Sequence, residues 1–123
     1  MSVTPFVYNC ILERVVDGDT IDVTIDLGFN IYLKKQRVRL AEIDTPESRT
    51  RDLAEKKLGL EAKARLQELC GSTIKIQSLG RGKFGRILGI PYTEDGQSIC
   101  QILIDEGHAV KYDGGKKHKW GDY

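Results

Sequence analysis

Five charged residues in three short segments have the side chains that metal-assisted cleavage of a phosphodiester requires. They are Asp19, Asp44, Glu47, Arg39 and Arg86. Carboxylates bind hard cations, a further carboxylate can act on a water molecule, and guanidinium groups hold phosphate oxygens. Three carboxylates and two guanidiniums sum to −1, which would repel a phosphate, and one divalent cation changes that sum to +1. The set therefore makes chemical sense chiefly with a metal ion.

The two aspartates are the first candidates for binding that ion. Asp19 follows the dipeptide Asp17-Gly18, and Asp44 is followed by Thr45-Pro46. A lone aspartate after a glycine usually caps a turn, so the ligand role of Asp19 depends on the second segment. No His or Cys lies near either segment, and an all-oxygen set selects a hard cation. An adaptable, loop-borne set favours Ca²⁺; Mg²⁺, which demands stricter octahedral geometry, stays open.

The spacing of Arg39 and Asp44 carries a structural prediction. Side chains alternate between the two faces of a strand, and these residues are separated by an odd number of positions. Strict pleating would therefore place them on opposite faces. We predict a bend or bulge before Asp44, because only then can both side chains reach one site.

Alternating or clustered β-branched residues predict strand segments at residues 7–16, 21–27, 31–33, 38–43, 74–79 and 86–92. Asp17-Gly18 is a hairpin dipeptide, and Pro91 predicts a position at a sheet edge or bulge. Apolar residues at helical spacing predict one helix that ends at Gly71 and a second that ends at Gly107. Residues 51–58 contain good helix formers, but Gly59 interrupts them, so we predict a mobile loop or a loose turn there.

Short strands in meander order, followed by helices, predict a mainly β domain of the α+β class in which helices cap a small barrel. The pattern does not distinguish an OB-type barrel from a related roll. With 123 residues, the chain is long enough for one domain with its own core. We therefore predict a single domain over residues 1–123, with flexible ends at 1–6 and 114–123.

Cysteine usage and hydropathy bear on the cellular compartment of the protein. Cys10, Cys70 and Cys100 are odd in number and lack metal-ligand spacing, so we expect small buried hydrophobes. The first residues do not form a charged start followed by a long apolar run, and no stretch approaches the roughly 18 apolar residues of a membrane span. If the chain is complete, these features predict a cytoplasmic protein without membrane contact.

Basic residues are clustered although the net charge is only +1. The clusters are Lys34, Lys35, Arg37 and Arg39; Arg81, Lys83 and Arg86; and Lys111, Lys116, Lys117 and Lys119. Such clusters either guide a polyanion or simply solvate the surface, and the sequence leaves both readings open. Near the end, Trp120 is a candidate anchor that folds back onto the domain, with phosphate contact by the neighbouring lysines as the alternative.

Four ordered segments resemble the staphylococcal nuclease (thermonuclease) family. They are Asp17-Gly18-Asp19-Thr20, Arg39-Leu40-Ala41-Glu42-Ile43-Asp44-Thr45-Pro46-Glu47, Gly59-Leu60-Glu61-Ala62 and Lys83-Phe84-Gly85-Arg86. With Asp95-Gly96 and Gly107-His108-Ala109, the resemblance covers residues 11–112. It implies a five-stranded OB-fold Greek-key barrel with two to three packed helices, and calcium-dependent cleavage of DNA and RNA.

The resemblance also implies a role for each residue of the set. Asp19 and Asp44 would bind the metal through their carboxylates, and Thr45 through its backbone carbonyl. Glu47 would be the general base that takes a proton from the attacking water or orients it. Arg39 and Arg86 would clamp the phosphate.

The sequence departs from the family pattern around the substrate. Gly82 stands in place of an aspartate, Phe84 in place of a tyrosine whose hydroxyl touches phosphate, and Cys100 in place of an asparagine. Two tyrosines that flank the base have no clear counterpart, although Tyr112 matches one after a shift of one residue. Lys83, Phe84 and Tyr112 are the expected substrate contacts.

Two functions follow as hypotheses. The first is a metal-dependent nuclease of low sequence specificity that acts as a monomer on DNA, RNA or both and favours single strands. The alternative is a catalytically weak or inactive OB-fold module that binds nucleic acid or serves as an adaptor. The complete set of three carboxylates and two arginines favours the enzyme.

Overall fold

The computed structural model of the protein describes residues 6–112, apart from the side chain of Lys83. The elements are β1 (Val7–Asp17), β2 (Thr20–Asp26), β3 (Tyr32–Leu40), β4 (Ile43–Asp44), α1 (Leu53–Cys70), β5 (Thr73–Arg81), the 3₁₀ turn η1 (Lys83–Gly85), β6 (Ile87–Tyr92), α2 (Ile99–Asp105) and β7 (Val110–Lys111). Nearly all of the ends predicted to be flexible, and Trp120 with its lysines, lie outside this range. No helix within it is long and apolar enough to cross a membrane.

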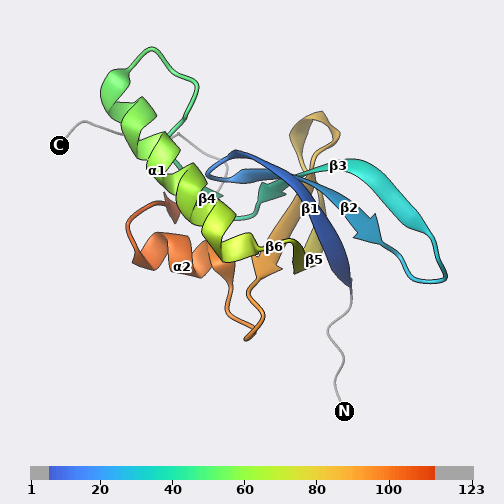
Figure 1. The fold of residues 1–123 in the computed structure, drawn as a ribbon. Coiled ribbons are helices and arrows are strands. Elements are labelled where there is room, and N and C mark those ends of the chain that lie inside the picture. Colours follow the sequence, from blue (N-terminus) through green and yellow to red (C-terminus); the bar gives the residue numbers. More distant parts are fainter. Residues whose placement is uncertain (1–5, 113–123) are drawn as a thin grey trace.

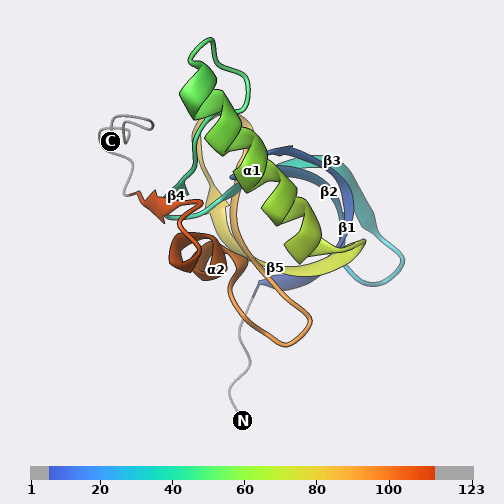
Figure 2. The same ribbon diagram turned by 60° about the vertical axis from the view of Figure 1, so that its left-hand side comes forward.

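Five strands close into a barrel in the order β1-β2-β3-β6-β5 (Figure 1). β1 pairs antiparallel with both β2 and β5, which closes the barrel, whereas β3 and β6 run parallel. α1 packs against β1 and α2, and α2 packs against β6, so both helices lie on one side of the barrel (Figure 2). The predicted mainly β, OB-type barrel with packed helices is therefore confirmed.

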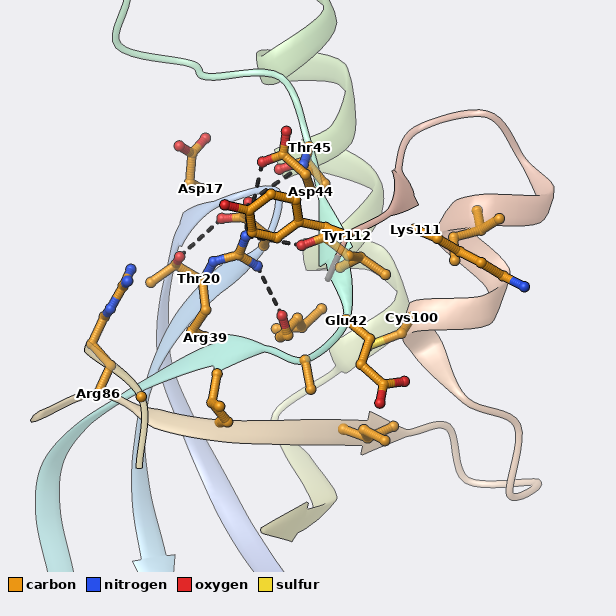
Figure 3. A pocket seen from close by; sticks show the side chains of 18 of the residues that line it. Asp17, Thr20, Arg39, Glu42, Asp44, Thr45, Arg86, Cys100, Lys111 and Tyr112 are labelled. Atoms are coloured by element: carbon orange, nitrogen blue, oxygen red, sulfur yellow. Dashed lines mark hydrogen bonds and ion pairs between the residues drawn. The ribbon is translucent and has the colours of Figure 1, made fainter. Parts of the chain in front are cut away.

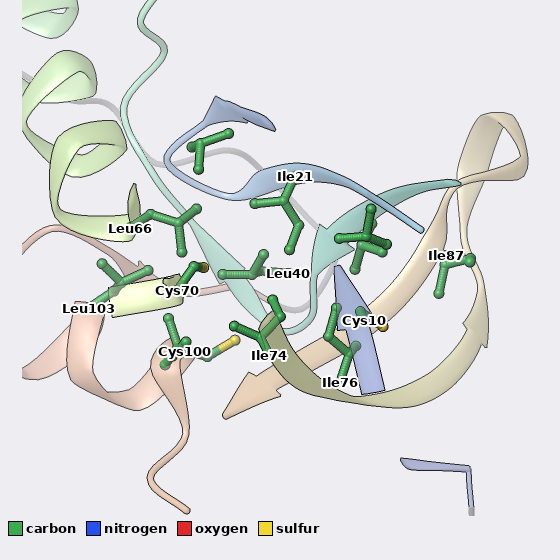
Figure 4. Packing of buried hydrophobic residues seen from close by; sticks show 14 of the residues in the cluster. Cys10, Ile21, Leu40, Leu66, Cys70, Ile74, Ile76, Ile87, Cys100 and Leu103 are labelled. Carbon is green, nitrogen blue, oxygen red and sulfur yellow. The ribbon is translucent and has the colours of Figure 1, made fainter. Parts of the chain in front are cut away.

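The core lies inside the barrel and under the two helices (Figure 4). Its largest fully buried aliphatic side chains are Ile21, Val23, Val38, Leu40, Ile43, Leu66, Ile99 and Leu103. Burying one such side chain contributes about 1.5–3 kcal/mol. Cys10, Cys70 and Cys100 are also buried and unpaired, as predicted.

The predicted division of residues 31–43 into strands is wrong. Residues 31–33 and 38–43 were expected to be separate strands, but Tyr32–Leu40 is continuous and only Ile43–Asp44 is separate. The polar residues 34–37 interrupt the apolar pattern from which the strands were predicted. Gln36 and Arg37 pair with β2, and Lys34 and Lys35 lie at a register irregularity, so the strand continues through residues whose side chains are exposed or half-buried.

Residues 51–58 were predicted to be a mobile loop or a loose turn of helix, and residues 53–58 are instead the first turns of a regular helix. α1 begins at Leu53, because the Asp52 side chain accepts hydrogen bonds from the backbone N–H groups of Ala54 and Glu55 and caps the helix. The helix continues through Gly59. A glycine inside a helix costs about 1 kcal/mol relative to alanine. Here it is required by packing, since a Cβ at Gly59 would lie 2.4 Å from the carbonyl oxygen of Glu47.

The predicted helix ends and the predicted edge position of Pro91 are confirmed. Gly71 and Gly107 follow the two helices with φ angles of 64° and 81°, in the left-handed region where glycine is favoured. Pro91 pairs with Ile76 of β5, in a part of β6 that β3 does not reach. Pro91 therefore lies at an edge, where its missing N–H removes no ladder hydrogen bond.

Candidate active site

The end of β3 positions Arg39 and reverses the chain directly after it. Glu42 has a φ of 65°, and this left-handed residue turns the backbone between Leu40 and Ile43. The guanidinium lies inside the reversal, where Nη1 donates to the Leu40 carbonyl at 2.8 Å and Nη2 to the Ile43 carbonyl at 2.9 Å. The predicted bend before Asp44 is confirmed.

The bend brings two carboxylates to the same guanidinium. Nη2 of Arg39 lies 3.3 Å from Asp19 and 3.8 Å from Asp44 (Figure 3). The side chains of Arg39, Asp19 and Asp44 are 14%, 13% and 4% exposed. Because two anions face one cation away from bulk water, the three groups carry an excess negative charge. Such a cluster attracts a further cation.

Asp19 is fixed by the turn between β1 and β2. One carboxylate oxygen accepts from the Thr20 hydroxyl at 3.0 Å, and the other accepts from the Thr45 backbone N–H at 3.4 Å. The turn approaches its neighbours closely, because a Cβ at Gly18 would lie 2.8 Å from Cβ of Ala62 and 2.9 Å from Oγ1 of Thr45. Only glycine lets the hairpin come this close to α1 and to Thr45.

The donor set fits a hard cation. Within residues 6–112, no group of three or more His, Cys, Asp or Glu side chains could hold a metal ion. A site at Asp19 and Asp44 would therefore need a backbone carbonyl and water to complete it. The Thr45 hydroxyl is shielded from solvent and has no hydrogen-bond partner among the described residues. The carbonyl contact from Thr45 stays what the family resemblance implies, and the unpartnered hydroxyl does not test it.

All five charged residues of the predicted set lie along one open cleft of about 1130 Å³, as Figure 3 shows for Arg39, Asp44 and Arg86. Thr45 and Tyr112 also line it. The Tyr112 backbone N–H donates to the Glu42 carbonyl at 2.8 Å, which holds the chain after β7 beside β4.

Four charged residues of the cleft were not predicted as site residues: Asp17, Glu42, Arg49 and Lys111. Asp17 was read only as a turn residue, yet its carboxylate accepts from the N–H groups of Gly18 at 3.1 Å and Ser48 at 3.2 Å. The Asp-Gly signal is local and does not reveal the second partner. Lys111 was noted only as a member of a basic cluster, and Arg49 has no local signal, since the fold brings it to the cleft.

The turn η1 forms the outer edge near Arg86. Phe84 has a φ of 61° and is 94% exposed, and its ring centroid lies 5.9 Å from the guanidinium carbon of Arg86. This is within the range of a cation–π contact. Of the predicted substrate contacts, Tyr112 lines the cleft and Phe84 lies outside its lining; the Lys83 side chain is not described.

Cys100 lies at the base of the cleft. Burial raises the pKa of its thiol to about 12, although the nearby positive charge of Arg39 acts in the opposite direction. The thiol therefore stays protonated at neutral pH and is a poor nucleophile. The position where the family pattern has an asparagine carries a small apolar group here.

A model of the staphylococcal nuclease homologue family matches residues 37–121. The chain belongs to this family. The match includes the segment from Arg39 to Glu47 and the segment around Arg86, which form two sides of the cleft.

Proteins named as endonucleases or nucleases are among its relatives. Endonuclease YncB of Bacillus subtilis (strain 168) is 36% identical over 106 residues, covering 82% of this chain and 46% of the relative. The micrococcal nuclease of Shigella flexneri is 33% identical over 108 residues, covering 80% and 55%. An uncharacterized endonuclease of Escherichia coli is 33% identical over 101 residues, covering 81% and 58%. The chain spans about half the length of these curated relatives.

Proposed function

We propose that this chain is a metal-dependent nuclease that hydrolyses phosphodiester bonds of DNA, RNA or both with low sequence specificity. One observation carries the proposal. The carboxylates of Asp19 and Asp44 converge on one guanidinium nitrogen, in a cleft that Glu47 and Arg86 also line. Family membership and the names of the relatives support the same reading.

Each residue has one task in the proposed reaction. Glu47 accepts a proton from the water that attacks phosphorus, and a placed general base typically contributes about 10²–10⁴-fold. Arg39 and Arg86 bind the non-bridging oxygens and remain charged as the negative charge on them grows. The 5′ P–O bond then breaks, which leaves a 3′-phosphate, and the departing 5′-oxygen takes a proton from solvent to become a hydroxyl.

Asp19, Asp44 and the Thr45 carbonyl are the residues that would hold the metal. When bound, the ion supplies positive charge to the phosphate and its attacking water. Ca²⁺ is the cation we propose, with Mg²⁺ as the alternative, because Ca²⁺ accepts irregular sets of oxygen ligands whereas Mg²⁺ demands near-ideal octahedral geometry.

Single strands are the proposed substrate form, bound by a monomer. The cleft is open, and an exposed aromatic ring stands at its edge at Phe84. Exposed rings offer a surface on which an unpaired base can stack, and this contact is insensitive to sequence.

The deciding experiment measures cleavage of single-stranded DNA, duplex DNA and RNA by the pure protein with Ca²⁺, with Mg²⁺ and with chelator. Arg86→Ala is the matched variant. We expect cleavage that requires a metal and falls strongly in the variant. Cleavage that survives both chelator and the substitution would refute the mechanism. Binding without cleavage in either metal would instead identify a binding or adaptor module.

A further inference from the structure

Glu47 is carried by a loop rather than by a strand or helix. Residues 45–52 connect β4 to α1, and the Glu47 side chain is exposed. A solvent-exposed side chain is not fixed by burial, so a firmly held backbone contributes to the placement of its carboxylate. A base in this position must be held in geometry accurate to a fraction of an ångström.

Three contacts hold that backbone, and all come from outside the loop. The Glu47 N–H donates to Oε2 of Glu55 at 2.9 Å, and the next N–H, of Ser48, donates to Oδ1 of Asp17 at 3.2 Å. On the other side, Gly59 lies directly against the Glu47 carbonyl, where a Cβ would come within 2.4 Å of the oxygen. α1 thus contacts both the N–H and the carbonyl of Glu47.

Glu55 is diverted from the contact that its sequence position favours. Asp52 and Glu55 have the spacing of a capping box, in which the glutamate accepts from the N–H of the capping residue. Here the Asp52 N–H donates to the Thr50 hydroxyl at 3.2 Å instead. The Glu55 carboxylate is therefore available to the Glu47 N–H.

We propose that Glu55 is a positioning residue for Glu47: its carboxylate fixes the backbone of the general base through one hydrogen bond from the first turn of α1. The inference rests on the proposed role of Glu47. Loss of the acceptor lets the loop move, which lowers the rate of the chemical step. Substrate binding by Arg39 and Arg86 is unaffected, because neither arginine belongs to this loop.

The test compares Glu55→Ala, Glu55→Gln and the control Glu61→Ala, an exposed carboxylate on the same helix. The readout is kcat and KM on a single-stranded DNA oligonucleotide with Ca²⁺. A misplacement of about 1 Å can cost on the order of 10²-fold in rate, so we expect Glu55→Ala to lower kcat by about 10- to 100-fold with KM within about twofold. Glu55→Gln retains a carbonyl acceptor and should restore most of kcat. Glu61→Ala should match the unsubstituted protein.

A second readout does not need activity. Trypsin can cut after Arg49 and Arg51 in the loop, and a loosened loop is cut faster. We expect faster cleavage in Glu55→Ala and an unchanged rate in Glu55→Gln, at unchanged thermal stability. If the unsubstituted protein cleaves no nucleic acid, the proposed function fails, and with it the role of Glu47, even where trypsin confirms the loop contact.

Three outcomes would overturn the inference while leaving the nuclease in place. The first is an unchanged kcat in Glu55→Ala. The second is Glu55→Gln as impaired as Glu55→Ala, since charge rather than the hydrogen bond would then be responsible. The third is a change confined to KM.

Discussion

The two sides of the cleft are built differently. The inner side, Asp19, Arg39 and Asp44, has side chains that are at most 14% exposed, and the guanidinium donates to one backbone carbonyl of β3 and one of β4. The outer side, Phe84 and Arg86, belongs to a turn between β5 and β6 and carries a ring that is 94% exposed. One side is fixed by the barrel, and the other stands in solvent.

The difference indicates a division of tasks. Charges removed from water must be compensated where they stand, so the inner side is preorganised and contributes to the fold as well as to chemistry. The outer side has few such constraints and can adjust to a substrate. Substitutions on the inner side should therefore change stability and activity together, and those on the outer side activity alone.

The largest effect is expected for Arg39→Ala. Removing one preorganised donor costs on the order of 10²–10³-fold in rate, and here two buried carboxylates also lose their shared cation. We expect a lower free energy of unfolding, measured in denaturant, with a smaller deficit in Ca²⁺ than in chelator. Arg39→Lys should recover part of the stability but little activity, because lysine lacks the planar fork. Unchanged stability in Arg39→Ala would contradict the proposed distinction between the inner and outer sides of the cleft.

Arg86→Ala should separate nuclease activity from the stability of the fold. We expect a loss of activity on the order of 10²-fold, as for other phosphate-binding donors. The free energy of unfolding should fall less than in Arg39→Ala, because Arg39 lies buried between two carboxylates. Denaturant unfolding followed beside nuclease assays checks both values. A larger loss of stability would show that the outer side also supports the barrel.

Phe84 allows a finer test of the outer side. Its left-handed backbone, with φ at 61°, disfavours residues with a Cβ by about 1–2 kcal/mol. Phe84→Gly should therefore unfold at the same temperature or higher, while KM for single-stranded DNA rises severalfold because the ring is lost. Phe84→Tyr keeps the ring and should leave KM unchanged or lower it. An unchanged KM in the glycine variant would exclude contact between the ring and the substrate.

The smallest effect is expected at a charged group remote from the cleft, which serves as the reference. The hydrogen bond from Arg37, assisted by the charges of Arg37 and Arg14, holds the pKa of Asp22 below its usual value of 3.8. A lowered folded-state pKa means that the contribution to stability is present at neutral pH and is lost as the pH falls through that pKa. Asp22→Asn should cost about 0.2–1 kcal/mol at pH 7, with activity unchanged. In denaturant titrations the difference should shrink as the pH falls below 3.8 and through the lowered folded-state pKa of Asp22.

Much of the barrel and the charged set could be predicted from the sequence, since both have local signals. Asp17-Gly18 marks a hairpin, and the odd spacing of Arg39 and Asp44 requires the bend that Glu42 makes. The missed features depend on contacts distant in the chain. Gly59 continues a helix because a loop packs on it, and Asp17 bonds to Ser48 across 31 positions. No local pattern encodes such partners.

The close approach at Gly18 links two properties: the packing of α1 on the barrel and the placement of the proposed metal-binding residues. The β1–β2 turn rests on Ala62 of the helix and on Thr45 without room for one methyl group, and the same turn carries Asp19. Separation of α1 from the barrel therefore also releases Asp19 and Thr45 from their places. Heating should abolish cation affinity and helical signal in one transition, with coincident midpoints by calorimetry and circular dichroism.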